Sequence, residues 1–313
     1  MSSFPILNLP LIPIQKVISF LPPGALVHLA LTSKRLKTII GLTNLFVDYF
    51  RISITNFTCR IEMKLFYNEC KFIWIFRERA PPIRPHATLF REFKSSYVPN
   101  PLRNMKIAVE WISKMIRFPV GIVTIRGSMY DGIEDILRWE PIHQCEQLEV
   151  RNVDFSNVEE AAQPDFKLFK DLEILTISNG GWLEVDHLAQ LLETENIQTQ
   201  ITDCSFTWER VNEFVKIWME SGNTKLRRLW IQFESNDEEN GNRRMLFEGL
   251  EIRPRDPEMR PKNYPRYPHF PAVFCEHAQD IIRQDGALAS LVPSRNCFHF
   301  VVWHPEDSNR QRS

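Results

Sequence analysis

One apolar spacing recurs along residues 120–231, and it restricts the possible folds more than any other feature. The spacing is apolar-x-x-apolar-x-apolar, and its central positions are 123, 148, 175 and 229. The steps between them are 25, 27 and 54 residues, and 54 is twice 27, so a degenerate copy is expected near residues 200–202. Such a repeat is typical of stacked units that bury their apolar faces on one another.

Amphipathic stretches follow several copies of this spacing and predict helices over residues 131–139, 184–193 and 208–220. A strand and a helix every 25–27 residues match the scale of leucine-rich repeats. The sequence therefore predicts an α+β or α/β fold with a strand-helix, leucine-rich-repeat-like domain over residues 119–235. An ordinary α/β layer with coincidental spacing remains the alternative.

The first 45 residues differ from this domain and predict three short helices. Apolar residues follow the i, i+3, i+4, i+7 spacing from Ile14 to Leu21, and a Pro-Pro-Gly sequence then ends the first helix. Ser33 is a favourable N-cap for the third helix. Three short helices cannot bury all of their apolar side chains against one another. We expect the remainder to lie on the next domain or on a partner.

The other segments carry weaker patterns. Apolar clusters predict strands within residues 46–77 and at Cys297–Trp303, and helical spacing predicts a helix over residues 102–117. Six prolines in residues 254–271 favour an extended connector, with a short basic-aromatic recognition segment as the alternative. The expected domains are a helical docking module at 1–45, a β-rich and helical connecting region at 46–118, the repeat domain at 119–235, a proline-rich connector with a closing strand at 236–303 and a disordered tail at 304–313.

The charge balance argues against a polyanionic partner. Lys and Arg number 38 and Asp and Glu number 39, so the formal net charge is −1. A near-neutral chain lacks the electrostatic footprint of nucleic-acid binding, and an anionic membrane surface is disfavoured for the same reason. The chain also lacks the run of about 18 apolar residues from which a membrane-spanning helix is built.

Catalytic chemistry finds no support in the sequence. Glycine-rich phosphate-binding loops and the common nucleophile and kinase motifs are absent. The six cysteines are scattered and never form CxxC, which predicts buried, reduced thiols in an intracellular protein. We therefore predict no enzymatic activity, no catalytic residue, no metal and no cofactor.

A zinc site is the one metal alternative. Each of the pairs Cys275-x-His277, Cys297-x-His299 and His143-x-Cys145 would place two soft ligands on one face of a strand. Their spacing is tighter than that of known zinc sites, so buried thiols are the preferred interpretation.

Tryptophans gather in the repeat region and are candidates for an aromatic binding groove. Trp218 lies on an apolar helix face and is expected in the core. Trp182 follows Gly180-Gly181 at a strand-to-helix turn, so it is the weak candidate for exposure and substrate contact. The substrate-binding surface is otherwise unknown.

Two parts of the chain are similar to known domains. Residues 4–45 carry, in order, the lead-in Phe4-Pro5-Ile6-Leu7-Asn8-Leu9-Pro10, the apolar helix spacing and Leu31-Thr32-Ser33-Lys34-Arg35-Leu36. In this they resemble an F-box of the nematode type. Further along the chain stand Trp182-Leu183-Glu184-Val185-Asp186-His187-Leu188, Val211-Asn212-Glu213-Phe214-Val215-Lys216-Ile217-Trp218 and Leu226-Arg227-Arg228-Leu229. This order is similar to that of the nematode F-box-associated domain of type two.

The resemblance implies a substrate-recognition adaptor of a Skp-cullin-F-box ubiquitin ligase, located in the cytoplasm or nucleus. The N-terminal three-helix F-box would dock on the Skp-type adaptor, and the C-terminal domain would hold an unknown protein substrate. The docking residues that it implies are Leu9, Pro10, Ile14, Val17, Ile18, Leu21, Leu26 and Leu31. One helix face cannot contact both the neighbouring helices and the adaptor. Some of these residues are therefore expected to pack between the three helices, and Leu31 is the first candidate. The alternative is a stand-alone protein-binding repeat domain, without a ligase role, that the helices cap.

Overall fold

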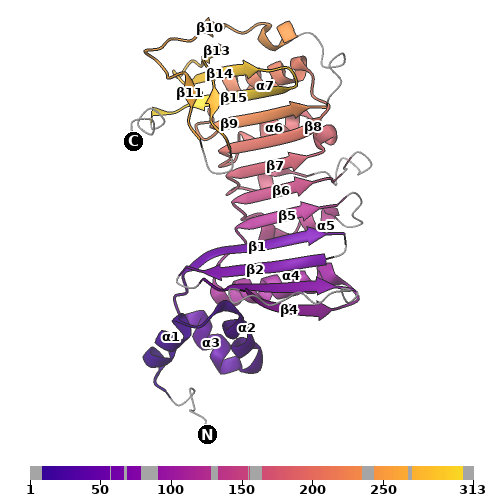
Figure 1. Ribbon diagram of the computed structural model, residues 1–313, viewed down its shortest axis with the longest axis vertical. Helices are drawn as coiled ribbons and strands as arrows, with labels where there is room; N and C mark the ends of the chain where they lie inside the picture. The colour runs from indigo at the N-terminus through magenta and orange to yellow at the C-terminus, as the bar shows by residue number, and fades with distance from the viewer. Residues whose placement is uncertain are drawn as a thin grey trace. The chain divides into compact units, whose positions relative to one another are not determined.

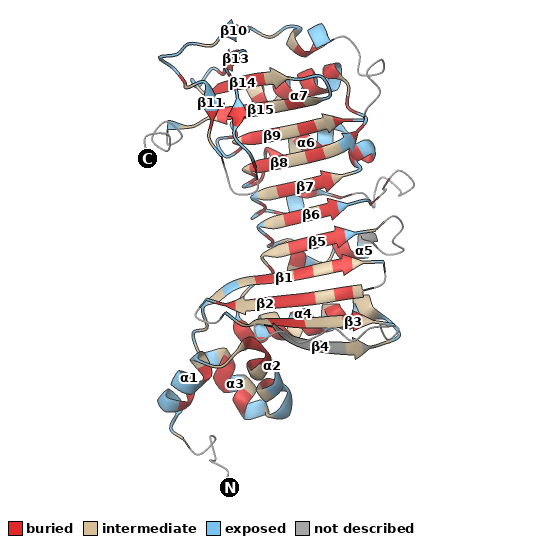
Figure 2. Ribbon diagram, viewed as in Figure 1, coloured by how far each residue is buried: buried red, intermediate tan, exposed pale blue. Residues whose placement is uncertain are grey.

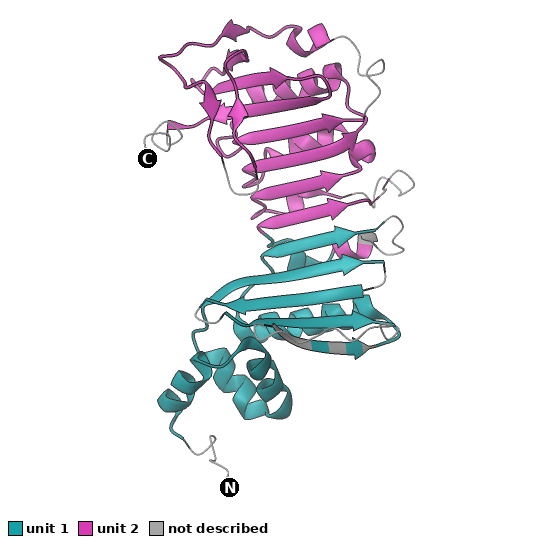
Figure 3. Ribbon diagram, in the orientation of Figure 1, with its two compact units in different colours: residues 1–131, 139–145 teal, residues 132–138, 146–313 magenta. Residues whose placement is uncertain are grey.

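The chain forms two compact units (Figure 3). Unit 1 holds residues 1–131 and 139–145, and unit 2 holds residues 132–138 and 146–313. The computed structural model describes residues 9–56, 58–66, 69–78, 91–127, 133–153, 155, 164–234, 243–266 and 270–305. Residues 4–8 of the predicted lead-in and residues 306–313 of the predicted tail lie outside these ranges. The five-part division expected from the sequence stays a prediction.

Unit 1 contains helices in its N-terminal part and after residue 100 (Figure 1). Their bounds are α1 (Leu11–Ser19), α2 (Pro23–Thr32), α3 (Lys34–Leu42) and α4 (Pro101–Ile116). The Ser33 hydroxyl accepts a hydrogen bond from the backbone N–H of Leu36 at 3.3 Å and so caps α3. The Asn100 side chain caps α4 in the same way, accepting from Arg103 at 2.8 Å. The predicted helices in the first 45 residues and over 102–117 are confirmed.

A mixed sheet forms the rest of unit 1, in the order β5-β1-β2-β3-β4. Its strands are β1 (Val47–Thr55), β2 (Thr58–Leu65), β3 (Lys71–Arg77), β4 (Arg91–Tyr97) and β5 (Ile122–Arg126). The pairs β1–β2 and β2–β3 are antiparallel, whereas β1–β5 and β3–β4 are parallel. Buried and half-buried residues alternate along β1 (Figure 2), and α4 packs on β2 and β3. One face of this sheet is therefore the core face, where Phe50, Ile52 and Ile61 are buried.

Unit 2 contains a second mixed arrangement, in the order β10-β13-β14-β15-β9-β8-β7-β6. The strands β6 (Gln147–Arg151), β7 (Ile174–Ser178), β8 (Gln198–Cys204) and β9 (Arg228–Phe233) run parallel. The strands β10 (Arg253–Pro254), β13 (Gln279–Ile282), β14 (Leu288–Pro293) and β15 (Cys297–Trp303) pair antiparallel, and β15 pairs with β9. The predicted closing strand is confirmed with the same bounds.

The periodic spacing marks strands, as predicted. Val123, Leu148, Leu175 and Leu229 lie in β5, β6, β7 and β9, and the degenerate copy near residue 200 is β8. The helices are α5 (Ile133–Leu137), α6 (Val185–Leu191) and α7 (Trp208–Glu220), with short 3-10 turns at Glu140–Ile142, Phe166–Leu168, Gly180–Trp182 and Arg243–Phe247. The leucine-rich-repeat likeness is not confirmed, because antiparallel strands extend the sheet of unit 2 beyond β9.

The proline-rich segment folds onto unit 2, so the predicted extended connector is wrong. It contains β11 (Asn263–Tyr264), which pairs with β12 (Val273–Phe274). Arg260 is fully buried and binds Asp280 through Nε and Nη2 at 2.8 and 2.7 Å. Tyr264 donates to the Arg227 carbonyl at 3.0 Å. The prolines stiffen the chain, while the residues between them supply a buried ion pair and a core.

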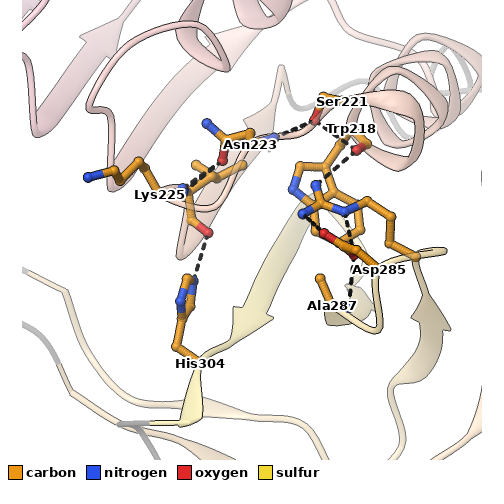
Figure 4. Close-up of polar contacts among 9 residues, drawn as sticks. Trp218, Ser221, Asn223, Lys225, Asp285, Ala287 and His304 are labelled. Carbon is orange, nitrogen blue, oxygen red and sulfur yellow. Dashed lines mark hydrogen bonds and ion pairs between the residues drawn. The ribbon is translucent and has the colours of Figure 1, made fainter.

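A polar network closes the end of α7 (Figure 4). The Arg283 guanidinium lies 4.6 Å from the centre of the Trp218 ring and donates to the Trp218 carbonyl at 3.4 Å. Asp285 accepts from Arg283 at 2.7 Å and from the Ala287 backbone at 3.1 Å. The hydrogen bond from Arg283 and that backbone donor lower the pKa of Asp285 to about 2. The β13–β14 turn thus satisfies a carbonyl at the helix terminus.

The six cysteines form no disulfide with one another, as the scattered spacing predicts. Cys59, Cys145, Cys204 and Cys275 are buried, and Cys70 and Cys297 are half-buried. Within the described ranges, none of the helices has both the length and the apolar character that crossing a membrane requires.

Candidate docking surface

The three N-terminal helices pack against one another and against unit 1. α3 contacts α1, α2 and α4, and α2 also contacts β2 and β3. The Gln15 amide donates to the Leu42 carbonyl at 3.0 Å, which ties α1 to the end of α3. Gly41 lies so close to α4 that a side-chain Cβ would come within 3.3 Å of the Met115 carbonyl. The helices therefore have a fixed support from the rest of unit 1.

A set of large apolar side chains remains outside this packing. Ile12 is 77% exposed and Phe20 is 74% exposed. With Lys16 they form one stripe of α1, because residues four apart lie on the same side of a helix. Figure 2 shows the exposed segments on α1, α2 and α3. We call the whole set the apolar docking surface, and its members are Leu11, Ile12, Val17, Phe20, Leu31, Leu42 and Phe46.

Five of the eight docking residues implied by the resemblance reach the surface, and their role in docking stays a prediction. Pro10, Val17 and Leu31 are exposed, and Leu9 and Leu21 are half-buried. The other three are corrected: Ile14, Ile18 and Leu26 have no exposed area, so they support the helices from inside.

The expected packing of Leu31 is also wrong, because its side chain is 49% exposed. It precedes the break between α2 and α3, where Ser33 adopts an extended backbone, so its side chain falls outside the interhelical contact. Phe20 is not among the residues that the resemblance implies, although its spacing of three residues from Val17 indicates a shared side of α1.

The docking helices carry only positive charge. Asp48 is the first acidic residue of the chain, whereas Lys16, Lys34, Arg35 and Lys37 precede it. The Lys37 ammonium lies 5.2 Å from the centre of the Trp111 ring on α4, so a cation–π contact with α4 partly fixes its position. A partner that covers the apolar docking surface therefore meets a basic rim and fits best if its own rim is acidic.

Trp182 is buried, so the expectation that it reaches a substrate is wrong. Only 7% of its surface is exposed, and its ring centre lies 4.5 Å from that of Phe155 and 5.5 Å from that of His187. Burial lowers the pKa of His187 and so favours its neutral form. The backbone N–H of Glu184 donates to His187 Nδ1 at 3.0 Å. The two glycines therefore allow a tight turn that points this tryptophan inward, and Trp218 is buried as predicted.

The Cys-x-His pairs do not assemble into a metal site. Over the described ranges, the structure contains no cluster of three or more His, Cys, Asp or Glu side chains suited to a metal ion. Burial raises the pKa of Cys275 to about 11, which disfavours the thiolate that binds metals. His299 stacks on Trp230 and lies 3.3 Å from the Arg228 guanidinium. Burial and that cation lower the pKa of His299 to about 4.

A hollow of about 440 Å³ opens in unit 2, and no sequence pattern indicated it. Its walls include Phe247, Ile252 and Phe274, with Arg243 and His277 as polar members. Phe274 and Ile252 are exposed. An apolar hollow with few polar groups suits a side chain of a binding partner.

The described structure thus combines three N-terminal helices that expose large apolar side chains with a second unit built from a mixed sheet and helices. Residues 6–56 match the family model of the F-box domain, and residues 163–231 match that of the F-box associated family. The chain therefore contains one region that matches the F-box domain and a second region that matches the F-box associated family. F-box domains bind Skp-type adaptors in cullin-RING ligases, and both families are binding rather than catalytic domains.

The chain also has a curated relative in a nematode. An uncharacterized protein of Caenorhabditis elegans is 22% identical over 356 aligned positions, which cover 96% of this chain and 79% of the relative. No solved structure matches the chain.

Proposed function

We propose that this protein is the substrate-recognition subunit of a Skp-cullin-F-box ubiquitin ligase. Its three N-terminal helices dock on the Skp-type adaptor, and unit 2 holds a protein substrate. One observation carries the docking step: Ile12, Phe20 and Leu31 stay exposed on helices whose interior is fully packed.

The physical reason is the cost of apolar area in water. Burying an exposed aliphatic or aromatic side chain contributes about 1.5–3 kcal/mol, so the apolar docking surface supplies enough free energy for a specific complex. Exposed apolar clusters on a soluble unit mark interaction sites. The buried residues Ile14, Ile18 and Leu26 hold the surface in shape, which lowers the entropic cost of binding.

In this function the chain performs no bond chemistry itself. It raises the local concentration of the substrate near the catalytic subunits of the ligase. A ubiquitin ligase of this class works inside the cell, so the proposal includes an intracellular location.

The docking step is tested by co-purifying the full chain with a Skp-type adaptor. We expect Phe20→Asp to abolish the complex, because it replaces one of the two most exposed apolar side chains that the partner would cover with a charge. Leu168→Asp is the matched control, because Leu168 is an exposed leucine of unit 2. Circular dichroism of each variant verifies that it is folded. A folded F20D variant that still co-purifies would refute the docking step.

The stand-alone alternative makes a different forecast. If the helices only cap the fold, F20D leaves the binding of the protein partner of unit 2 unchanged. The reason is that an exposed residue contributes little to a cap. Deleting residues 1–45 does not distinguish the docking hypothesis from the capping hypothesis. In both cases α2 packs on the sheet and α3 packs on α4, so the deletion removes part of the support of unit 1.

A further inference from the structure

The charge of the chain is divided unevenly between its two units. Unit 1 contains 18 Lys and Arg and 8 Asp and Glu, a net charge of +10. Unit 2 contains 20 Lys and Arg and 31 Asp and Glu, a net charge of −11. The near-neutral net charge of the whole chain is therefore the sum of a strongly basic unit 1 and a strongly acidic unit 2. Only part of that charge lies on the docking helices.

Strand register gathers further cations on one face of the unit 1 sheet. Arg51 of β1, Arg60 and Lys64 of β2, and Lys71 and Arg77 of β3 occupy alternate strand positions, and Lys64 is paired with Lys71. Their strand neighbours of opposite parity are the buried residues of the core face. These five residues therefore lie on the face opposite α4, and we call them the cationic sheet face.

Nearby carboxylates neutralise this face only in part. The Glu62 carboxylate accepts from Tyr49 at 2.6 Å and pairs with Arg60 and with Lys71, the latter at 3.7 Å. Burial alone would raise the pKa of Glu62, but these partners together lower it, so it stays ionised. Lys64 binds Asp48 at 2.6 Å. Two carboxylates thus serve five cations.

The arginines retain unused binding capacity. Within the described part of the chain, Arg77 forms no ion pair, and Arg51 forms none in direct contact, although it faces Glu62 across β1 and β2 and its charge helps to lower the pKa of that carboxyl. The Nε atoms of Arg51, Arg60 and Arg77 are buried and find no hydrogen-bond acceptor there, so a ligand would meet the outer parts of these guanidinium groups. The side chains of Arg60 and Lys71 are 39% and 38% exposed, so the charges remain within reach of a ligand. Guanidinium groups bind carboxylates through paired hydrogen bonds, which fits this unmet capacity.

We propose that the cationic sheet face binds an acidic segment of a partner protein. The cations lie on three neighbouring strands about 4.8 Å apart, so an extended segment crossing β1, β2 and β3 meets positive charge at each strand. The face is separate from the apolar docking surface, and the inference does not rest on the proposed function.

A polypeptide fits this face better than a nucleic acid does. Base stacking needs a free aromatic ring, but the Tyr49 ring lies 5.7 Å from the Arg51 guanidinium and 5.4 Å from the Lys71 ammonium. The Tyr49 hydroxyl is already bonded to Glu62.

The test is fluorescence anisotropy of a short labelled poly-glutamate peptide with the full chain. We expect binding that weakens as salt rises, and an affinity roughly tenfold lower for the double variant R51Q/R77Q. The control R103Q/K114Q removes two exposed cations of α4, on the other side of the sheet, and should bind as the wild type does. F20D should also bind as the wild type does, which separates this inference from the docking step.

Other outcomes overturn the proposal. If the wild type and a folded R51Q/R77Q variant bind the poly-glutamate peptide equally well, the cationic sheet face is not its binding site. If that variant does not fold, K64Q/K71Q provides the same comparison on the same face. Tighter binding of a single-stranded polyuridylate, lost in the same variants, would assign the face to nucleic acid instead. Self-association at low salt that these variants abolish would assign it to a second copy of the chain.

Discussion

Arg260 brings a full positive charge into the interior of unit 2, and its partners decide whether unit 2 tolerates it. Asp280 accepts from Arg260 at 2.7 Å and from the Ser290 hydroxyl at 2.6 Å. The Trp303 indole in turn donates to Ser290 at 2.9 Å and lies 5.3 Å from the guanidinium. A buried ion pair with its hydrogen bonds satisfied is tolerated, whereas a half-removed pair leaves an uncompensated charge.

Arg260→Met should therefore lower the free energy of unfolding by about 3–5 kcal/mol, because Asp280 remains buried without its cation. Urea unfolding of the full chain measures this loss. Arg253→Met is the control, since the Arg253 side chain is mostly exposed and should change stability little. An R260M variant as stable as the wild type would show that the pair is not buried.

His299 makes stability depend on pH. Its pKa falls from an ordinary value of 6.5 to about 4 in the folded chain, through burial and the neighbouring Arg228. Between these values the unfolded chain binds more protons than the folded chain does, so acid favours unfolding. Stability should fall as pH is lowered from 6.5 to 4.

His299→Gln removes this titration, so its loss of stability over the same pH range should be smaller than that of the wild type. Thermal unfolding at a series of pH values measures the difference. His187, whose pKa is also lowered by burial, keeps part of the acid sensitivity in both proteins. Parallel curves for the two proteins would mean that His299 is solvated in the folded state.

At the scale of elements, α3 depends on its first turn. The Ser33 side chain satisfies the backbone N–H of Leu36, one of the donors that a helix start leaves unpaired. Ser33→Ala should cost about 1 kcal/mol of stability, whereas Ser33→Asp keeps a capping oxygen and should cost less. Chemical unfolding of the two variants tests this order. The reverse order would place the start of α3 elsewhere.

Periodicity made the strands predictable, because an alternating apolar pattern can be satisfied in few ways. The degenerate copy near residue 200 was found as β8 from its spacing alone, although Gln198 and Thr199 are polar. These side chains are nonetheless buried, and Thr199 donates to Asn196 at 2.8 Å. Thr199 thus replaces an apolar residue where a buried partner is available, whereas the Gln198 Oε1 atom is buried without a hydrogen-bond partner in the described part of the chain.

The direction of single side chains was less predictable. Leu31 and Trp182 were each assigned to the wrong side of the surface, because helix ends and tight turns decide their direction. The proline-rich segment misled for a related reason. Arg260 and Tyr264 of this segment are buried, and their hydrogen-bond partners lie 20 or more positions away in the sequence.

At the scale of the whole molecule, the summed charge is a poor guide to partners. A net charge of −1 argued against polyanions, yet it combines +10 on unit 1 with −11 on unit 2. Charge acts over about a Debye length of 8–10 Å, so the local balance decides what binds. The division between the units became visible only with the fold.

Two separate surfaces on unit 1 follow from this. The apolar docking surface lies on α1 to α3, and the cationic sheet face lies on β1 to β3. Raising salt should weaken peptide binding at the cationic sheet face strongly and adaptor binding weakly, because hydrophobic contact is not screened. Titrations of both ligands at low and high ionic strength compare them. Equal salt dependence would mean that one surface serves both ligands.

Hydrogen–deuterium exchange of the full chain, with and without a Skp-type adaptor, tests most directly whether a partner covers the docking helices. We predict slower exchange in peptides from residues 11–46 when the adaptor is present, and no change in peptides from residues 198–233 of unit 2. Protection confined to unit 2, or unchanged exchange across α1 to α3 in a verified complex, would contradict the proposed docking mode.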